Sequence, residues 1–261
     1  MPASRAQRIE QFLDYYGAIH ALDDAYATRE ALAGHRAAAE NLFAQSEAFV
    51  GTLPWDAIGT ALDVGMGYGL HCAEFARRGA ATTGVTVHLP HELAAHAREH
   101  GYAAERQDMH FLDFADGSFD LVWASHTLEH SFAPLLALRE WIRVCRPGGW
   151  VCVTVPPHVS RIVSGHFTTG WSVGQLAYML ALAGLDCRDG RFVKEGYNVR
   201  GLVQRPATPL SDEGASWMFN LKDRLPRRIA ESMTEHPGSL GRFFYEGALD
   251  AIEPEPMEAR P

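Results

Sequence analysis

Three glycines at alternate positions, Gly65, Gly67 and Gly69, directly follow a short apolar run that contains Asp63. Glycine tolerates positive φ and has no Cβ, so a loop of this composition can lie directly against a ligand. The carboxylate of Asp63 can pair with a cationic group of that ligand. Two common phosphate-binding loops do not fit, because a dinucleotide fingerprint needs Gly or Ala at Leu70 and a P-loop needs Lys-Ser/Thr after the glycines.

The stretch DVGMGYG (63–69) resembles the first motif, D/E-x-G-x-G-x-G, of class I S-adenosylmethionine (SAM)-dependent methyltransferases and matches each of its fixed positions. The stretch QDMHFLDFADGSFDLVWASHTLEH (107–130) resembles the family's segment from an adenine-binding acid to the loop facing the transferred methyl group. A third stretch, REWIRVCRPGGWVCVTVP (139–156), resembles the helix and strand that follow. The resemblance covers about residues 61–157, and it implies SAM as cofactor and methyl transfer as the reaction.

The resemblance also implies which residues bind the cofactor. Asp63 is expected near the SAM ammonium group, and Asp108 is expected to accept from the adenine amino group, with a backbone N–H of Met109 beside the ring. The full expected set is Asp63, Gly65, Met66, Gly67, Gly69, Thr86, Val87, Asp108, Met109 and Ser125.

Thr86 departs from the pattern of the family. The second strand normally ends in an Asp or Glu that binds both ribose hydroxyls, whereas the threonine here resembles some branches such as the cyclopropane-synthase-like enzymes. Neutral hydrogen bonds are about half as strong as those to a charged group. We therefore expect usable but weaker SAM binding, with His88 as a possible additional contact.

Two histidines follow the predicted strand DLVWA (120–124) at the end that faces the cofactor. Neutral histidine is suited to removing the proton of a hydroxyl near pH 7. We therefore predict an oxygen acceptor, His126 as general base and His130 beside it as support. The alternatives are a positioning or packing role for His126 and a structural role for His130.

A metal site is a second interpretation of the same residues. The segment His126-x-x-Glu129-His130 resembles the E-x-x-E-H set of some O-methyltransferases, with His in place of the first Glu. That set holds a divalent metal in enzymes such as small-RNA 2′-O-methyltransferases and a ubiquinone-pathway enzyme. His158 or His166 would complete the set, and N,O ligands suit such a site. The main prediction contains no metal, and His126, Glu129 and His130 are the ligands of this alternative.

The elements that must position these residues alternate between strands and helices. Such alternation predicts an α/β protein with a Rossmann-like, doubly wound, mainly parallel sheet, a helical N-terminal cap and a C-terminal extension. The predicted units are the cap (1–52), the SAM-binding core (53–205) and the extension (206–261), which is expected to be loose. The expected helices are 4–50, 70–78, 90–101, 134–145 and 173–183, and the expected strands are 61–64, 81–87, 120–124, 150–155, 187–194 and 198–204.

Composition limits the partners. The 261 residues carry a formal charge of −9, which argues against nucleic acid and anionic membranes as partners. No signal core or membrane-length apolar run is present, and the four cysteines form no C-x-x-C pair, so a cytoplasmic protein is expected.

The acceptor is predicted to be a hydroxylated small molecule, such as a sugar or natural-product intermediate. The support is the polar and aromatic loop PPHVSRIVSGHFTTGW (156–171). A non-catalytic regulatory or interaction protein with the same fold is the alternative from another class, and the sequence predicts no oligomeric state.

Overall fold

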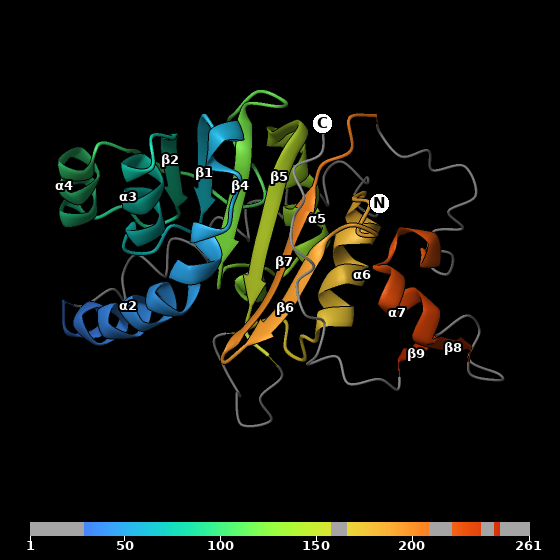
Figure 1. Ribbon diagram of the computed structural model, residues 1–261. Helices are drawn as coiled ribbons and strands as arrows, with labels where there is room; N and C mark the ends of the chain where they lie inside the picture. Colours follow the sequence, from blue (N-terminus) through green and yellow to red (C-terminus); the bar gives the residue numbers. More distant parts are fainter. Residues whose placement is uncertain (1–28, 158–165, 209–220, 236–242, 246–261) are drawn as a thin grey trace, which may run out of the picture.

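A computed structural model describes residues 29–157, 166–208, 221–235 and 243–245 (Figure 1). The predicted N-terminal helix is described from α2 (Arg29–Gly51) onward. The first part of that prediction, His158 and the end of the C-terminal extension lie outside the described residues.

The core is a seven-stranded sheet of order β3-β2-β1-β4-β5-β7-β6. The first five strands are parallel, β7 is antiparallel to β5, and β6 is antiparallel to β7. This confirms the predicted Rossmann-like, mainly parallel sheet. The strands are β1 (Thr60–Val64), β2 (Ala81–Thr86), β3 (Ala103–Arg106), β4 (Phe119–Ser125), β5 (Cys145–Val155), β6 (Arg191–Glu195) and β7 (Asn198–Gln204).

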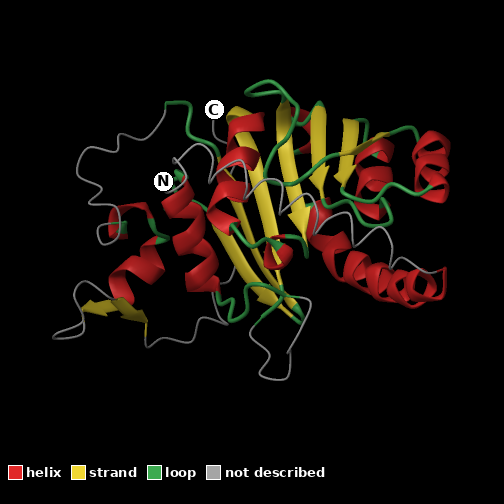
Figure 2. Cartoon of the chain, turned by 180° about the vertical axis from the view of Figure 1, so that it is seen from behind, coloured by secondary structure: helices red, strands yellow, loops and turns green. Residues whose placement is uncertain are grey.

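Helices cover both faces of the sheet (Figures 1 and 2). The helices that cover the sheet are α2, α3 (Leu70–Arg77), α4 (His91–His100), α5 (Pro134–Val144) and α6 (Val173–Ala183). The strand side chains alternate between two core clusters, since Leu121 and Trp123 pack with Phe49 of α2, whereas Val122 packs with α5 and α6. No helix in the described ranges is both long and apolar enough to cross a membrane.

Several element boundaries differ from the prediction. Helix α6 has the predicted bounds, but β5 begins at Cys145 because the RPGG segment continues the strand through a register shift opposite β4. Strand β6 begins at Arg191 rather than at 187, because residues 187–190 form a turn in which the Gly190 amide donates to the Cys187 carbonyl. Strand β3 was not predicted, because its four residues are mostly exposed and show no apolar pattern.

Part of the predicted C-terminal extension belongs to the main core. The described elements of this region are η3 (Lys222–Arg224), α7 (Arg227–Ser232), β8 (Met233–Glu235) and β9 (Phe243–Tyr245). Leu221, Leu225 and Ile229 are at most 5% exposed and lie in the same core cluster as α5 and α6. Residues 221–230 are therefore packed rather than loose, as the burial of these apolar side chains requires.

The sheet has its topological switch point between β1 and β4. Chain order runs outward from β1 to β2 and β3 on one side, and from β4 to β5 on the other. Ligands of open α/β sheets bind outside the carboxyl ends of the strands at this point. Because Val64 pairs with Ala124 at the ends of these strands, the glycine loop and Ser125-His126 leave the sheet side by side.

Candidate cofactor and acceptor site

The three glycines of the loop serve different purposes. All have positive φ, at 72° for Gly65, 51° for Gly67 and 74° for Gly69. A Cβ added at Gly65 would overlap the Thr127 side chain, and one added at Gly69 would overlap the Tyr102 hydroxyl, whereas a Cβ at Gly67 meets nothing within 4 Å. Packing therefore requires the outer two glycines, and the middle glycine leaves open space beside the backbone where a ligand can lie.

Hydrogen bonds hold the loop in this shape. The amides of Gly65 and Met66 both donate to the carbonyl of Val85, at 2.9 and 3.1 Å, and the amide of Gly69 donates to the carbonyl of Met66 at 2.8 Å. The loop that follows β1 is thus fastened to the end of β2, so its backbone is ordered before any ligand arrives.

Asp63 lies beneath this loop and is 1% exposed. The Cys72 thiol donates to its Oδ2 at 3.4 Å. Burial raises the pKa of Asp63 to about 7, and the hydrogen bond from Cys72 opposes that rise. The ionised carboxylate therefore needs a nearby cation, as the expected contact with an ammonium group would supply.

The expected ribose contact lies at the end of β2. The Thr86 hydroxyl donates to the carbonyl of His88 at 3.1 Å, and the Val87 carbonyl accepts from Arg106 Nε at 2.8 Å. These local bonds shape the turn after the strand and leave Thr86 partly exposed at the same edge as the glycine loop.

Asp108, expected at the adenine, is oriented by a histidine that sequence analysis did not single out. Its Oδ1 accepts from the His110 amide at 2.7 Å and lies 2.8 Å from His110 Nδ1, and the other ring nitrogen lies 2.6 Å from Ser131 Oγ. His110 is 2% exposed. The Trp141 indole donates to the Met109 carbonyl at 2.9 Å, so the backbone beside Asp108 is fixed as well.

His126 has an unusual backbone, and both of its ring nitrogens lie near polar atoms of other residues. Its φ of 54° is the only positive value at a non-glycine residue in the described ranges, a conformation that costs free energy and is concentrated at functional sites. Its Nε2 lies 2.8 Å from Asn198 Oδ1 and its Nδ1 lies 3.3 Å from Glu129. Since an amide oxygen only accepts, Nε2 carries a proton, and the ring stacks on Tyr197 with a centroid distance of 5.8 Å.

A chain of hydrogen bonds connects His126 to helix α2. The Asn198 amide donates to Gln45 Oε1 at 3.0 Å while its oxygen faces His126. Two further elements thus meet at the carboxyl end of β4, because Asn198 begins β7 and Gln45 lies in α2. No motif or spacing in the sequence connects these residues.

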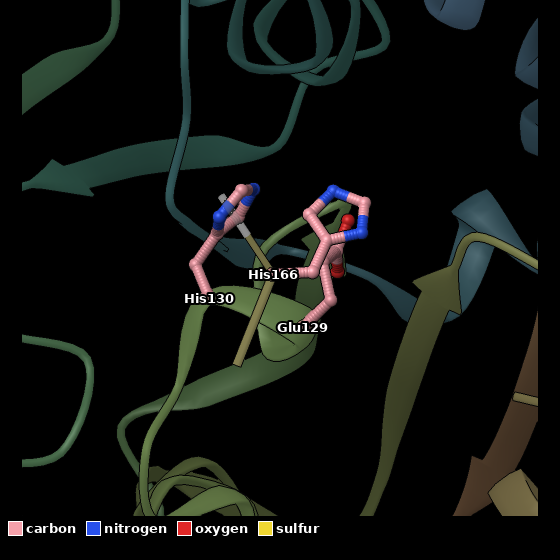
Figure 3. A group of neighbouring side chains, drawn as sticks. All are labelled: Glu129, His130 and His166. Atoms are coloured by element: carbon pink, nitrogen blue, oxygen red, sulfur yellow. The ribbon is translucent and has the colours of Figure 1, made fainter. Parts of the chain in front are cut away.

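The second predicted histidine lies in a different group. His130 comes together with Glu129 and His166, whose ligand-type atoms all lie within 4.8 Å of one another (Figure 3). The ring of His126 is outside that group. Burial lowers the pKa of His166, and the nearby Glu129 opposes this effect, so the imidazole is neutral near pH 7.

Comparison with known proteins identifies a methyltransferase domain in part of the chain. A family model described as a methyltransferase domain matches residues 62–153. An uncharacterized methyltransferase of Mycobacterium sp. (strain JLS) is 43% identical over 90 residues, which cover 34% of this chain and 36% of that protein. A ubiquinone biosynthesis O-methyltransferase of Pseudomonas paraeruginosa (strain DSM 24068 / PA7) is 35% identical over 97 residues, covering 35% and 42%. Methyltransferase GfsG of Streptomyces halstedii is 31% identical over 165 residues, covering 56% and 59%.

Residues 62–153 match the methyltransferase-domain family, and the sheet around them has the fold of class I SAM-dependent methyltransferases.

A solved structure agrees with this assignment at the level of the fold. The chain superimposes on the Burkholderia thailandensis 1,6-didemethyltoxoflavin-N1-methyltransferase, solved with its substrate and S-adenosylhomocysteine, with a TM-score of 0.51, 20% identity and coverage of 79% of this chain and 92% of that one. The chain spans about a third of the length of the first curated relatives, since the match covers 36% of the mycobacterial protein.

The methyltransferase-domain match implies SAM as the cofactor, and the residues present fit it. Gly67 keeps open space at the switch point, and the buried carboxylate of Asp63 is suited to a cationic partner. The family match includes Asp108 and His126 but ends at residue 153, before His166 and Asn198. The contacts of individual residues with SAM remain predictions.

We predict that Gly67→Val abolishes SAM binding. A branched side chain would enter the open space beside the loop and resist the positive φ. Gly79→Val is the matched control, because Gly79 also has positive φ and no neighbour within 4 Å of an added Cβ but lies after α3, away from the loop. Calorimetric titration with SAM should show binding by the control and none by Gly67→Val. A folded Gly67→Val protein with wild-type affinity would place the cofactor elsewhere.

Asp63 predicts a pH dependence of cofactor binding. Because its pKa in the free protein is about 7, the carboxyl is mostly protonated below that pH, and an ammonium group nearby would favour the ionised form. SAM binding should therefore release a proton, and affinity should rise by up to about tenfold per pH unit from about pH 5.5 to about pH 7. Calorimetry in two buffers of different protonation enthalpy measures this release. The Asp63→Asn variant should bind SAM more weakly and should release no proton on binding. An equal pH dependence of SAM binding in this variant would contradict the assignment of Asp63 to the SAM ammonium group.

Proposed function

We propose that this protein transfers the methyl group of SAM to a hydroxyl oxygen of a small molecule. The observation that carries the proposal is the pairing of β1 with β4, which sets the glycine loop beside a histidine with its own carboxylate partner. An oxygen nucleophile must lose a proton during the transfer, and this pair is suited to accept it. The similarity to a protein named as an O-methyltransferase supports the same class of acceptor.

The reaction requires alignment above all. The acceptor oxygen attacks the methyl carbon of the sulfonium, a C–O bond forms, and the C–S bond breaks with its electron pair returning to sulfur. The leaving group is already good, so holding oxygen, carbon and sulfur in line supplies much of the catalysis, up to several kcal/mol. The fastened glycine loop would fix the cofactor side of this geometry.

His126 is the proposed base, with Asn198 and Glu129 as its partners. The amide oxygen of Asn198 favours the tautomer with the proton on Nε2, which leaves the lone pair on Nδ1. A proton taken up at Nδ1 would be stabilised by the Glu129 carboxylate 3.3 Å away. His130 remains a proposed supporting residue at the same place in the chain.

The surroundings suit an acceptor with a ring. Tyr197 is 37% exposed and stacks on His126, and Phe167, next to His166, is 67% exposed. Aromatic surfaces of this kind bind flat or ring-shaped molecules, while the histidines and Glu129 supply polar contacts. We therefore propose a hydroxylated natural-product or sugar intermediate, in line with the prediction from the loop over 156–171.

The direct test of the proposal combines binding with turnover. Calorimetry should show saturable binding of SAM and of its demethylated product, and a panel of hydroxylated aromatic compounds and sugars, incubated with SAM labelled in its methyl group, should yield a labelled product. No binding of either cofactor form at about 1 mM, where ΔG is only about −4 kcal/mol, would overturn the proposal. SAM binding with no transfer to any acceptor would instead favour the regulatory alternative.

We predict that His126→Ala lowers the turnover number by about 10²- to 10⁴-fold, the usual contribution of a general base. SAM affinity should change little, because the expected cofactor contacts lie on other residues. Asn198→Ala is a useful companion, since it leaves the histidine in place but removes the partner of Nε2. If His126→Ala keeps more than about a third of wild-type turnover, far short of that loss, alignment alone carries the reaction.

A further inference from the structure

Buried polar atoms without a partner are concentrated beside the proposed base. The described residues contain eight such side-chain atoms, and four of them belong to Glu129 and to the segment that begins at His166. Buried polar groups are nearly always hydrogen-bonded or bound to an ion, because leaving them unpaired costs free energy. The four atoms are Glu129 Oε2, His166 Nδ1, Thr168 Oγ1 and Trp171 Nε1.

The backbone fixes His166 over Glu129. The amides of Phe167 and Thr168 donate to the Glu129 carbonyl at 2.8 and 3.1 Å, so the segment after His166 is tied to the 3-10 helix η2 (Leu128–His130). The rings of His130 and His166 meet edge to face with centroids 5.1 Å apart, and the Glu129 carboxylate lies close to the His166 ring (Figure 3).

We infer that Glu129, His130 and His166 bind a divalent transition-metal ion. Their ligand atoms lie within 4.8 Å of one another, and ligands bound at about 2.1 Å to one ion are at most about 4.2 Å apart, so small side-chain rotations close the site. Two imidazoles and a carboxylate suit zinc, iron, cobalt or manganese better than magnesium or calcium, which prefer oxygen ligands alone.

The surrounding residues resemble the support that metal ligands usually have. While Glu129 Oε2 faces the ion, its other oxygen lies near His126 Nδ1, and the chain continues through Asn198 to Gln45 of α2. Such outer contacts orient ligands and are needed for full affinity. His126, predicted as a ligand in the metal alternative, is thus a positioning residue for the ion.

A role for this ion in methyl transfer rests on the proposed function. Three protein ligands would leave positions open on the ion, which would act as a Lewis acid toward the acceptor hydroxyl. His126 would take the hydroxyl proton as the oxygen attacks the methyl carbon of SAM, and sulfur would regain the C–S electron pair. Glu129 connects the two roles, because it contacts both the base and the ion.

Metal binding can be measured without any acceptor. The protein is first freed of metal with a chelator, and the chelator is then removed. The metal-free protein is titrated with Mn²⁺ by calorimetry and with Co²⁺ by visible absorption spectroscopy. We expect one ion per chain and a Co²⁺ spectrum of a low-symmetry nitrogen and oxygen site. His166→Ala and His130→Ala should each weaken binding at least about tenfold, the size of effects seen even for outer residues.

His91→Ala is the matched control, because His91 is exposed on α4 and belongs to no group of metal-competent residues within the described ranges. It should bind both ions as the wild type does. SAM titration of each variant checks that the cofactor site and the fold are intact. No saturable Mn²⁺ or Co²⁺ binding below about 1 mM, or wild-type metal affinity in His166→Ala, would overturn the metal site. Failure of SAM binding in the wild type would instead overturn the proposed function.

Discussion

The parallel pairing of β1 with β4 is the constraint on which the site depends. Val64 and Ala124 are neighbours across this pair, so the chain must leave both strands at one place. The glycine loop on one side and the segment from Ser125 to His130 on the other follow within a few residues of that register. The Thr127 hydroxyl donates to the Val64 carbonyl at 3.0 Å, and it occupies the space that a side chain at Gly65 would need. The two loops are therefore built against each other, and a shift of one strand would disrupt both.

Sequence analysis predicted those parts of the molecule that local patterns specify. The glycine loop, α6 and the strand after Phe119 have strong signals in composition and spacing, and their places agree with the structure. The missed parts depend on contacts between distant segments. Asn198 lies 72 residues from His126, and nothing near it in the chain marks it as the partner of that histidine. Leu225 was placed in a loose extension because prolines and charges surround it, whereas its burial depends on a core formed by α5 and α6.

The site also shows where stability and function conflict. Asp63 is buried and accepts a hydrogen bond from a weak donor, the Cys72 thiol, and burial raises its pKa to about 7. Its raised pKa means that the free protein loses stability as pH rises from about 4 to about 7, since the unfolded carboxyl ionises in this range and the buried one does not. A residue chosen for stability alone would be apolar or fully hydrogen-bonded. A bound cation would offset the cost of burying the ionised carboxylate, and SAM, the cofactor that the glycine motif predicts, carries such a group.

His126 also has features that are costly for stability, on the side of the site proposed for the acceptor. A positive φ at a residue with a side chain is held only when the surroundings force it, and here both ring nitrogens have partners from two other elements. A histidine that served packing alone would need neither the strain nor the two polar contacts. Because one of those contacts is Glu129, whose second oxygen is buried without a partner, the strained residue and the unpaired atom belong to one arrangement. Glu129 therefore joins the histidine fixed by β7 to the segment that carries His166, and the proposed acceptor side of the site is centred on it.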